Sequence, residues 1–173
     1  RIFQAAPVTQ ADIETLFSAH IRQHDELGWD AASAAVTARR SRRLGAIMLS
    51  ESPLPRPDPD TLLPVFIAGL QGMGSEALPW TPALRQWQAR VGILRRLAPE
   101  AWPDVSDSAL MTSLERWAGP WLEGLSRASE LAAFPLHDAL TALLTWPQQQ
   151  ELEQSLPVSL IVPSGSSVDI DYT

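Results

Sequence analysis

Four arginines stand within one stretch of five residues, and they are Arg39, Arg40, Arg42 and Arg43. The chain has 13 basic residues, all of them arginine, against 20 acidic residues. This run therefore carries +4, while the remaining 9 arginines and 20 carboxylates leave the rest of the chain at −11. Guanidinium groups bind phosphate through forked, weakly hydrated contacts. The run is our candidate binding site, and it favours contact with a phosphate backbone.

Two other interpretations of the run stay open. The arginines could pair with an acidic neighbouring domain, or they could keep an exposed strand edge charged and so prevent aggregation. Read as a strand, residues 34–43 place Arg40 and Arg42 on one face and Arg39 and Arg43 on the other. A strand with arginine on both faces belongs at an edge or in a protruding hairpin.

Trp29 is close to the run in the sequence and has two interpretations of its own. Tryptophan is rarely buried completely, and its ring can stack on bases. Trp29 is therefore either a core residue or a surface platform beside the arginines. We include it with the four arginines as a hypothetical nucleic-acid contact.

A glycine motif at residues 72–77, Gly-Met-Gly-Ser-Glu-Ala, matches the dinucleotide fingerprint G-x-G-x-x-A. That chemistry needs a strand before the motif and a helix after it. Here a helical pattern precedes it and Pro79 follows, so the glycines are expected to end a helix. The chain has no lysine, which excludes a Walker-type phosphate loop and a Schiff-base enzyme.

Histidine and serine patterns are also too sparse for a site. His20 and His24 have helical spacing, but His137 is the only other histidine and there is no cysteine to complete a zinc site. The serines at 164 and 166 lack the strand-to-helix turn of a hydrolase nucleophile. We therefore expect no catalytic residue, no bound cofactor and no metal site in this chain.

Composition is that of a folded globular protein. The chain has 173 residues, of which 45% are hydrophobic and 19% charged, enough for one core or two small ones. A net charge of −7 argues against whole-surface binding to nucleic acid or to an anionic membrane. No apolar run approaches the ~20 residues of a membrane span. The first residues, Arg-Ile-Phe, and the strand-like end suggest a piece of a longer chain.

The first third is expected to contain strands. A stub of strand at residues 2–6 precedes a helix capped by Thr9, whose buried stripe comprises Ile13, Leu16, Phe17 and Ile21. A three-stranded meander follows at 23–30, 34–43 and 46–51, with a capped helix from Asp30 to Gly45 as the alternative.

The middle of the chain is expected to be helical. Alternating prolines over 53–59 form a stiff connector. About five helices follow, beginning near Asp60, Thr81, Ser106, Pro135 and Pro147, the third of them kinked or ended near Pro120. Four tryptophans fall on apolar stripes and are predicted to be core residues: Trp87, Trp117, Trp121 and Trp146.

The predicted fold class is α+β, with a helical subdomain inserted between a small meander and terminal strands. Residues 1–56 form the helix and basic meander, 57–157 the helical subdomain, and 158–173 a β-hairpin that packs back on the first part. The hairpin joins strands at 159–162 and 168–172 through a turn at 163–166.

Several segments resemble the C-terminal half of the HrpB family of bacterial DEAH-box ATP-dependent helicases. In order, they are AAPVTQADIETLF, GWD, ARRSRRLGAIMLSESPLP, LPW, RQWQARVGILRRL, WPDVSD and LIVPSGSSVDIDYT. The resemblance spans nearly the whole chain, but the ATPase motifs of the family have no counterpart here. It also favours the meander over the helix, because relatives have their basic run between similar strands.

The resemblance implies a non-catalytic accessory domain of an ATP-dependent RNA helicase in the cytoplasm. ATP and Mg²⁺ would belong to the motor domains of the parent chain. The expected partners are those motor domains and single-stranded RNA, contacted through Arg39, Arg40, Arg42, Arg43 and Trp29. The alternative is a protein-interaction module that docks on the motor without touching nucleic acid, with no role for a membrane or metal.

Overall fold

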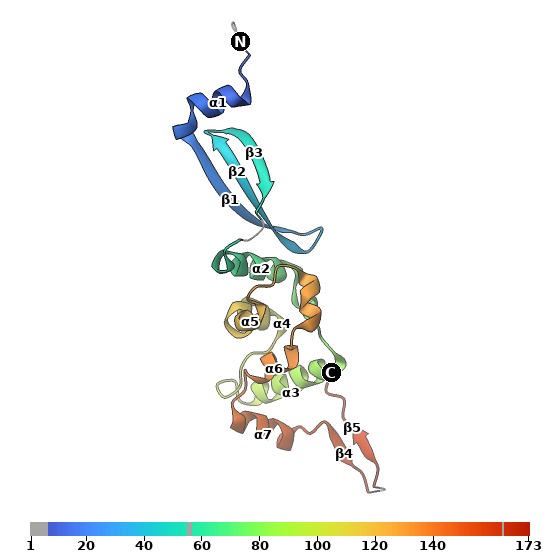
Figure 1. Cartoon of the computed structure of the whole chain (residues 1–173). Coiled ribbons are helices and arrows are strands. Elements are labelled where there is room, and N and C mark those ends of the chain that lie inside the picture. Colours follow the sequence, from blue (N-terminus) through green and yellow to red (C-terminus); the bar gives the residue numbers. More distant parts are fainter. Residues whose placement is uncertain (1–6, 55–56, 164) are drawn as a thin grey trace, which may run out of the picture.

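The computed structural model describes residues 7–54, 57–163 and 165–173, and it has an elongated shape (Figure 1). A helix and a three-stranded sheet form one end, a helical body forms the middle, and a two-stranded hairpin forms the other end. The α+β class is confirmed. The strand stub predicted at 2–6 lies outside the described residues.

Thr9 caps the first helix as expected. Its hydroxyl accepts a hydrogen bond from the Asp12 amide at 3.2 Å, and the Asp12 carboxylate accepts one from the Thr9 amide in return. The buried stripe predicted for this helix is wrong, because α1 (Gln10–Leu16) has no buried residue and Leu16 is 73% exposed. Periodicity identifies an apolar face, but it does not supply the element that would cover it.

The meander is confirmed. β1 (Ile21–Asp30) pairs antiparallel with β2 (Ala35–Leu44), which pairs antiparallel with β3 (Ile47–Pro53). A β-bulge interrupts the second pairing between Arg42 and Arg43. Gly45 has a positive φ of 58°, the left-handed conformation that a tight hairpin turn demands and that glycine adopts without strain.

The helical body contains the core. All buried hydrophobic residues of the described chain except Ala35 lie between Leu62 and Leu152. Trp87 and Trp117 are buried as predicted, whereas Trp121 and Trp146 are 39% and 70% exposed, so their prediction as core residues is wrong. Both exposed rings sit at helix ends, where an apolar stripe can run past the surface that it packs against.

Residues 57–157, all of which the structure describes, contain six α-helices and two short 3-10 helices rather than about five helices. They are α2 (Pro59–Met73), η2 (Ser75–Ala77), α3 (Pro82–Leu97), α4 (Asp107–Thr112), α5 (Leu114–Leu122), η3 (Ala128–Ala133), α6 (Leu136–Thr141) and α7 (Trp146–Ser155). The segment predicted as one helix from Ser106 divides at Ser113, and its second part ends two residues beyond Pro120. Gly74, with φ of 85°, ends α2 as expected of the glycine motif.

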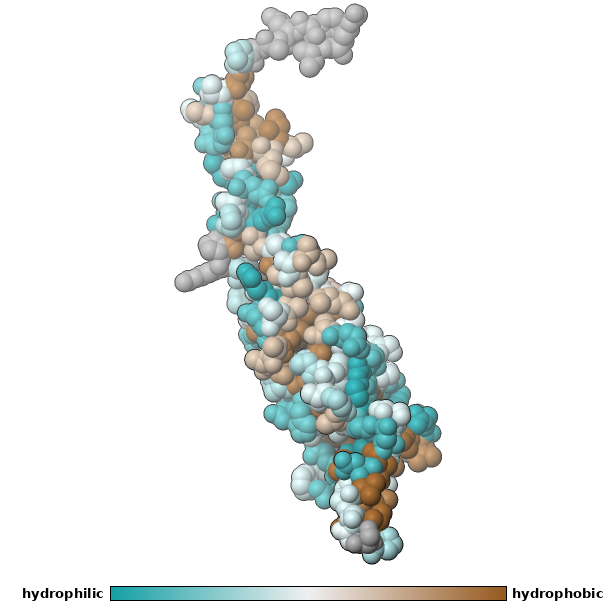
Figure 2. All heavy atoms as spheres, turned by 90° about the vertical axis from the view of Figure 1, so that its right-hand side faces the viewer, coloured by the Kyte–Doolittle hydropathy of each residue, from teal (hydrophilic) through white to brown (hydrophobic). Residues whose placement is uncertain are grey.

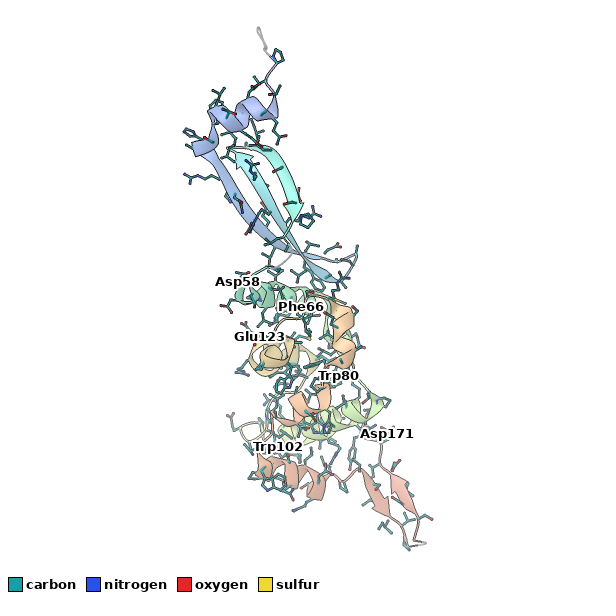
Figure 3. All side chains as sticks on the ribbon, in the orientation of Figure 1. Asp58, Phe66, Trp80, Trp102, Glu123 and Asp171 are labelled. Carbon is teal, nitrogen blue, oxygen red and sulfur yellow. The ribbon has the colours of Figure 1, made fainter. Side chains whose placement is uncertain are left out.

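The meander and the body meet at α2. The Trp29 ring lies 6.0 Å from that of Phe66, and Figure 3 shows Phe66 on α2, just below the sheet. A Cβ added to Gly69 would come within 2.1 Å of the Trp29 ring, so the absent side chain makes room for the indole. Backbone hydrogen bonds from Val36 to Ser126 (2.7 Å) and from Ala128 to Ala34 (2.8 Å) complete the joint.

The terminal strands form a separate sheet. β4 (Ser159–Ile161) pairs only with β5 (Ser167–Asp169), at the end of the molecule opposite the meander (Figure 1). The prediction that this hairpin packs back on the meander is therefore wrong, because strand patterns do not specify which strands pair. Instead, the tail contacts the body, where the Tyr172 amide donates to Gln86 of α3 at 2.8 Å. Apolar side chains remain exposed on the hairpin, at the lower end of Figure 2.

No helix within the described ranges is long and apolar enough to cross a membrane.

Candidate nucleic-acid interface

All four candidate arginines lie on β2, the central strand of the meander. The structure does not gather them into one cationic patch. Side chains alternate along a strand, so Arg40 and Arg42 share one face of the sheet and Arg39 and Arg43 share the other, as predicted. The sequence placed this strand at an edge or in a protruding hairpin. The edge is wrong, because β2 is the central strand, but the meander that contains it projects from the helical body (Figure 1).

On the first face, both arginines are engaged by carboxylates. Arg40 forms a two-pronged pair with Asp25 of β1, with Nε–Oδ1 and Nη2–Oδ2 distances of 2.7 and 2.8 Å. Arg42 reaches Glu14 of α1 at 3.0 Å. The second pair ties the exposed helix to the sheet, which explains how α1 is held without burying a side chain.

The second face is also paired, but less completely. Arg39 binds Glu51 of β3 at 2.8 Å, and Arg43 donates from Nη2 to Glu26 of β1 at 3.2 Å. The Arg43 Nε is buried and has no hydrogen-bond partner. The hydroxyl of Ser41, between these two arginines on the same face, is likewise buried without a partner.

Two of these pairs, Arg40–Asp25 and Arg39–Glu51, shift the pKa of at least one member. The hydrogen bonds from Arg40 hold the pKa of Asp25 below its ordinary value of 3.8, because they stabilise the carboxylate. The hydrogen bond to Glu51 likewise raises the pKa of Arg39. The side chains of all four pairs are at least partly exposed to solvent, and such ion pairs contribute little net stability.

Of the interpretations made from the sequence, pairing with carboxylates describes the arginines as they stand. The partners are not in a neighbouring acidic domain, however, but on α1, β1 and β3 of the same unit. Residues 7–54 contain 5 arginines and 6 carboxylates, so the unit is almost neutral at −1.

Trp29 does not stand beside the arginines. It pairs with Val36 near the β1–β2 turn, whereas the arginines extend toward the other end of β2. Its half-buried ring packs against α2, which favours the core interpretation over the platform. Nearness in sequence was misleading, because the hairpin carries Trp29 and Arg43 to opposite ends of the sheet.

Two further arginines were not predicted from the sequence. Arg22 of β1 lies directly opposite Arg43, a placement that alternation along residues 21–30 would have shown once the hairpin register was known. Arg90 of α3 is only 3% exposed and donates to the Leu156 carbonyl at 2.6 Å and to Glu153 at 2.8 Å. Arg90 fastens the end of α7 to α3, and no sequence signal distinguishes it from a surface arginine.

The remaining sequence candidates are dispersed. His20 ends η1 (Ser18–His20) and His24 lies on β1, so they do not share a helical face. In the part of the chain that the structure describes, no group of three or more His, Cys, Asp or Glu side chains is arranged to hold a metal ion. His137 contacts its neighbour Asp138 at 3.1 Å on an exposed surface, and Ser164 lies outside the described residues.

Comparisons with known proteins address the chain as a whole. A family model described as "ATP-dependent helicase C-terminal" matches residues 117–173, and one described as "ATP-dependent RNA helicase HrpB, connector region" matches residues 20–54. The chain is 32% identical over 153 residues to the ATP-dependent RNA helicase HrpB of Escherichia coli strain K12, which covers 88% of this chain and 19% of that protein.

Two crystal structures of E. coli HrpB share the fold. One, described as a DExH-box NTPase, matches 96% of this chain with a TM-score of 0.66 and 30% identity. The other, described as a DEAH/RHA helicase, matches the whole chain with a TM-score of 0.65 and 29% identity. The chain spans about a fifth of the length of these relatives. Sequence and fold together show that it belongs to the HrpB family of helicases, in which it corresponds to the connector and C-terminal regions.

Proposed function

We propose that this chain is a non-catalytic accessory region of an ATP-dependent RNA helicase, and that its meander docks it onto the motor domains of the same polypeptide. ATP and Mg²⁺ would act in those motor domains, in the cytoplasm. The E. coli relative is named as an ATP-dependent RNA helicase, and the model that matches the meander is described as a connector region.

One observation carries this proposal: an apolar surface lies uncovered at the free end of the meander. Five large hydrophobic residues there are between 44% and 73% exposed, and they are Val8, Leu16, Phe17, Ile47 and Met48. They come from α1, the segments beside it and the start of β3, which lie together at one end of the sheet (Figure 1). Apolar surface concentrated in this way marks an interaction site.

The charge of the meander fits the same role. The four clustered arginines already form ion pairs with carboxylates of α1, β1 and β3. The unit therefore does not present the strong positive field expected of a general nucleic-acid binder. A nearly neutral surface with an apolar centre and charged surroundings has the composition of a protein–protein interface. Two backbone hydrogen bonds and the Trp29 contact would transmit such docking to the helical body.

Binding to single-stranded RNA is the second candidate, and solvent exposure of the ion pairs favours it. The Arg39 side chain is 63% exposed and those of Arg40 and Arg42 are each 42% exposed. A phosphate could therefore reach any of the three without displacing core residues.

The docking proposal is tested by mixing this chain with the separately produced motor domains of its helicase and measuring association by analytical ultracentrifugation. Association should be lost in a Leu16→Glu/Met48→Glu variant, which places charge in the apolar surface. A Val158→Glu/Ile161→Glu variant, altered at the opposite end on equally exposed apolar residues, should still associate. Equal binding by both variants, or no binding by the unchanged chain, would refute docking through the meander.

A further inference from the structure

We propose that Arg22 and Arg43, facing each other across β1 and β2, bind the phosphate backbone of single-stranded RNA. The site differs from the four-arginine run, since it includes an arginine from outside the run and leaves out Arg40 and Arg42. It deepens the second candidate function above and does not depend on docking to the motor.

The first argument is the placement of like charges. Arg22 and Arg43 are direct partners in the antiparallel ladder, so their side chains lie on the same face. Like charges directly opposite one another destabilise a sheet. Arg22 is exposed. Within the described ranges, no carboxylate lies within 4.0 Å of its guanidinium group, the distance that defines an ion pair. A phosphate between the two guanidinium groups would remove this repulsion.

The second argument is the unfilled edge of the Arg43 guanidinium. In Arg40, the Nε and Nη2 edge receives both oxygens of Asp25 at 2.7 and 2.8 Å. In Arg43, the same edge makes a single bond of 3.2 Å to Glu26, whose side chain is 60% exposed, and its Nε has no partner. A buried donor without an acceptor is unfavourable. A phosphate replacing Glu26 would offer two oxygens to this edge, as Asp25 does to Arg40.

Ser41 gives independent support on the same face. Its side chain is 3% exposed and its hydroxyl has no hydrogen-bond partner. It lies two residues from Arg43 and pairs with His24 across the ladder. Buried polar atoms are nearly always satisfied in folded proteins, so these two neighbouring exceptions distinguish this face of β2 from the face of Arg40 and Arg42.

An exposed aromatic pair at the same end favours RNA over an acidic protein. Phe17 is 44% exposed, and its ring meets that of His20 edge-on with centroids 6.5 Å apart. His20 directly precedes the start of β1, two residues before Arg22. Proteins that bind single strands combine cationic contacts to the backbone with aromatic rings on which bases stack. Bases of a single strand could therefore stack on these rings while its phosphates contact the two arginines.

The test is fluorescence anisotropy of the whole chain with a labelled uridine oligomer of about 12 nucleotides, within the ~4–16 nucleotides that single-strand-binding modules cover. Affinity is measured between about 50 and 200 mM salt. In an Arg22→Ala/Arg43→Ala variant, binding at low salt should weaken by about tenfold or more. The slope of log affinity against log salt should shrink by about 1.4, since each lost contact to a single strand removes about 0.7.

The matched control is Arg96→Ala/Arg116→Ala, which removes the same charge from two exposed positions of the helical body. It should leave both affinity and slope nearly unchanged. Equal losses in the two double variants would overturn the site and indicate a general charge effect. Absence of binding by the unchanged chain at low salt would overturn RNA contact, while leaving the docking of the meander intact.

Two further arms secure the interpretation. Arg22→Ala alone removes an exposed side chain without an ion-pair partner, so it should fold normally and still lower the slope by about 0.7. Inorganic phosphate, added at constant ionic strength, tests whether an isolated phosphate suffices. It should not displace the RNA, and displacement by phosphate at millimolar concentration would overturn recognition of the RNA strand.

Discussion

The meander and the helical body are held together by different forces, although they belong to one continuous molecule. In the body, buried hydrophobic side chains form a contiguous core from Leu62 to Leu152. In the meander, Ala35 and Ser41 alone among residues 7–54 are buried, and four ion pairs connect its strands and helix. The body is therefore stabilised by its own buried core, whereas we expect the meander to rely on its contact with α2.

Charge separates the two regions as well. Residues 57–173 hold 6 arginines and 14 carboxylates, a balance of −8, against −1 for residues 7–54. The cationic run that stands out in the sequence is therefore neutralised locally, while the acidic excess lies on the body. Specific contacts, and not net charge, must decide what the meander binds.

The largest effect is expected in the core of the body. Leu140→Ala empties a position that is 0% exposed and should cost about 2–5 kcal/mol of unfolding free energy, measured by urea denaturation. Leu97→Ala, at a residue 78% exposed at the end of α3, should change stability by less than about 0.5 kcal/mol. Similar costs at the two positions would contradict a body stabilised by burial.

Gly69→Ala should break the joint between the two regions. The added methyl group would collide with the Trp29 ring, and such overpacking costs about 1–3 kcal/mol. Hydrogen exchange should then accelerate in β1 and β2 while the amides of α6 stay protected. Gly72→Ala is the control on the same helix, because its Cβ meets nothing within 4 Å and should stabilise α2 by up to ~1 kcal/mol. Unchanged exchange in the meander would mean that it does not rely on this contact.

Arg90→Ala tests the buried arginine of α3. It leaves the Leu156 carbonyl without its donor and should cost about 1–3 kcal/mol, loosening α7 without altering the meander. Arg96→Ala, on the exposed face of the same helix, should alter stability by less than about 0.5 kcal/mol. Urea denaturation, monitored by tryptophan fluorescence, measures both effects. Equal losses of stability in the two variants would show that Arg90 does not hold α7 against α3.

The smallest expected effect is on the stability of the meander at acidic pH. Arg40 lowers the folded-state pKa of Asp25 below 3.8, so this pair adds stability that is fully present above pH 3.8 and disappears as the pH falls through the lower folded value. NMR titration of Arg40→Ala should return the pKa of Asp25 toward 3.8. Asp107 in the body is the internal control. Burial raises its pKa, hydrogen bonds from Gln88, Ser75 and Arg85 outweigh that effect, and the substitution should leave it unchanged.

The sequence by itself determined the local elements and the family. Caps at Thr9, Thr81 and Ser106, the helix end at the glycine motif, the three-stranded meander and the two faces of the arginine strand all follow from short-range chemistry. Such features depend on residues a few positions apart, so a linear pattern contains the information needed to predict them.

Only the tertiary structure decided which surfaces meet. It gave each arginine of the run a carboxylate partner, placed Trp29 on α2, exposed Leu16 and Trp146, and set the terminal hairpin at the end opposite the meander. These outcomes depend on pairings between residues far apart in the sequence. Alternation and periodicity show which side chains share a face, but the partner of that face is fixed by the packing of the whole chain.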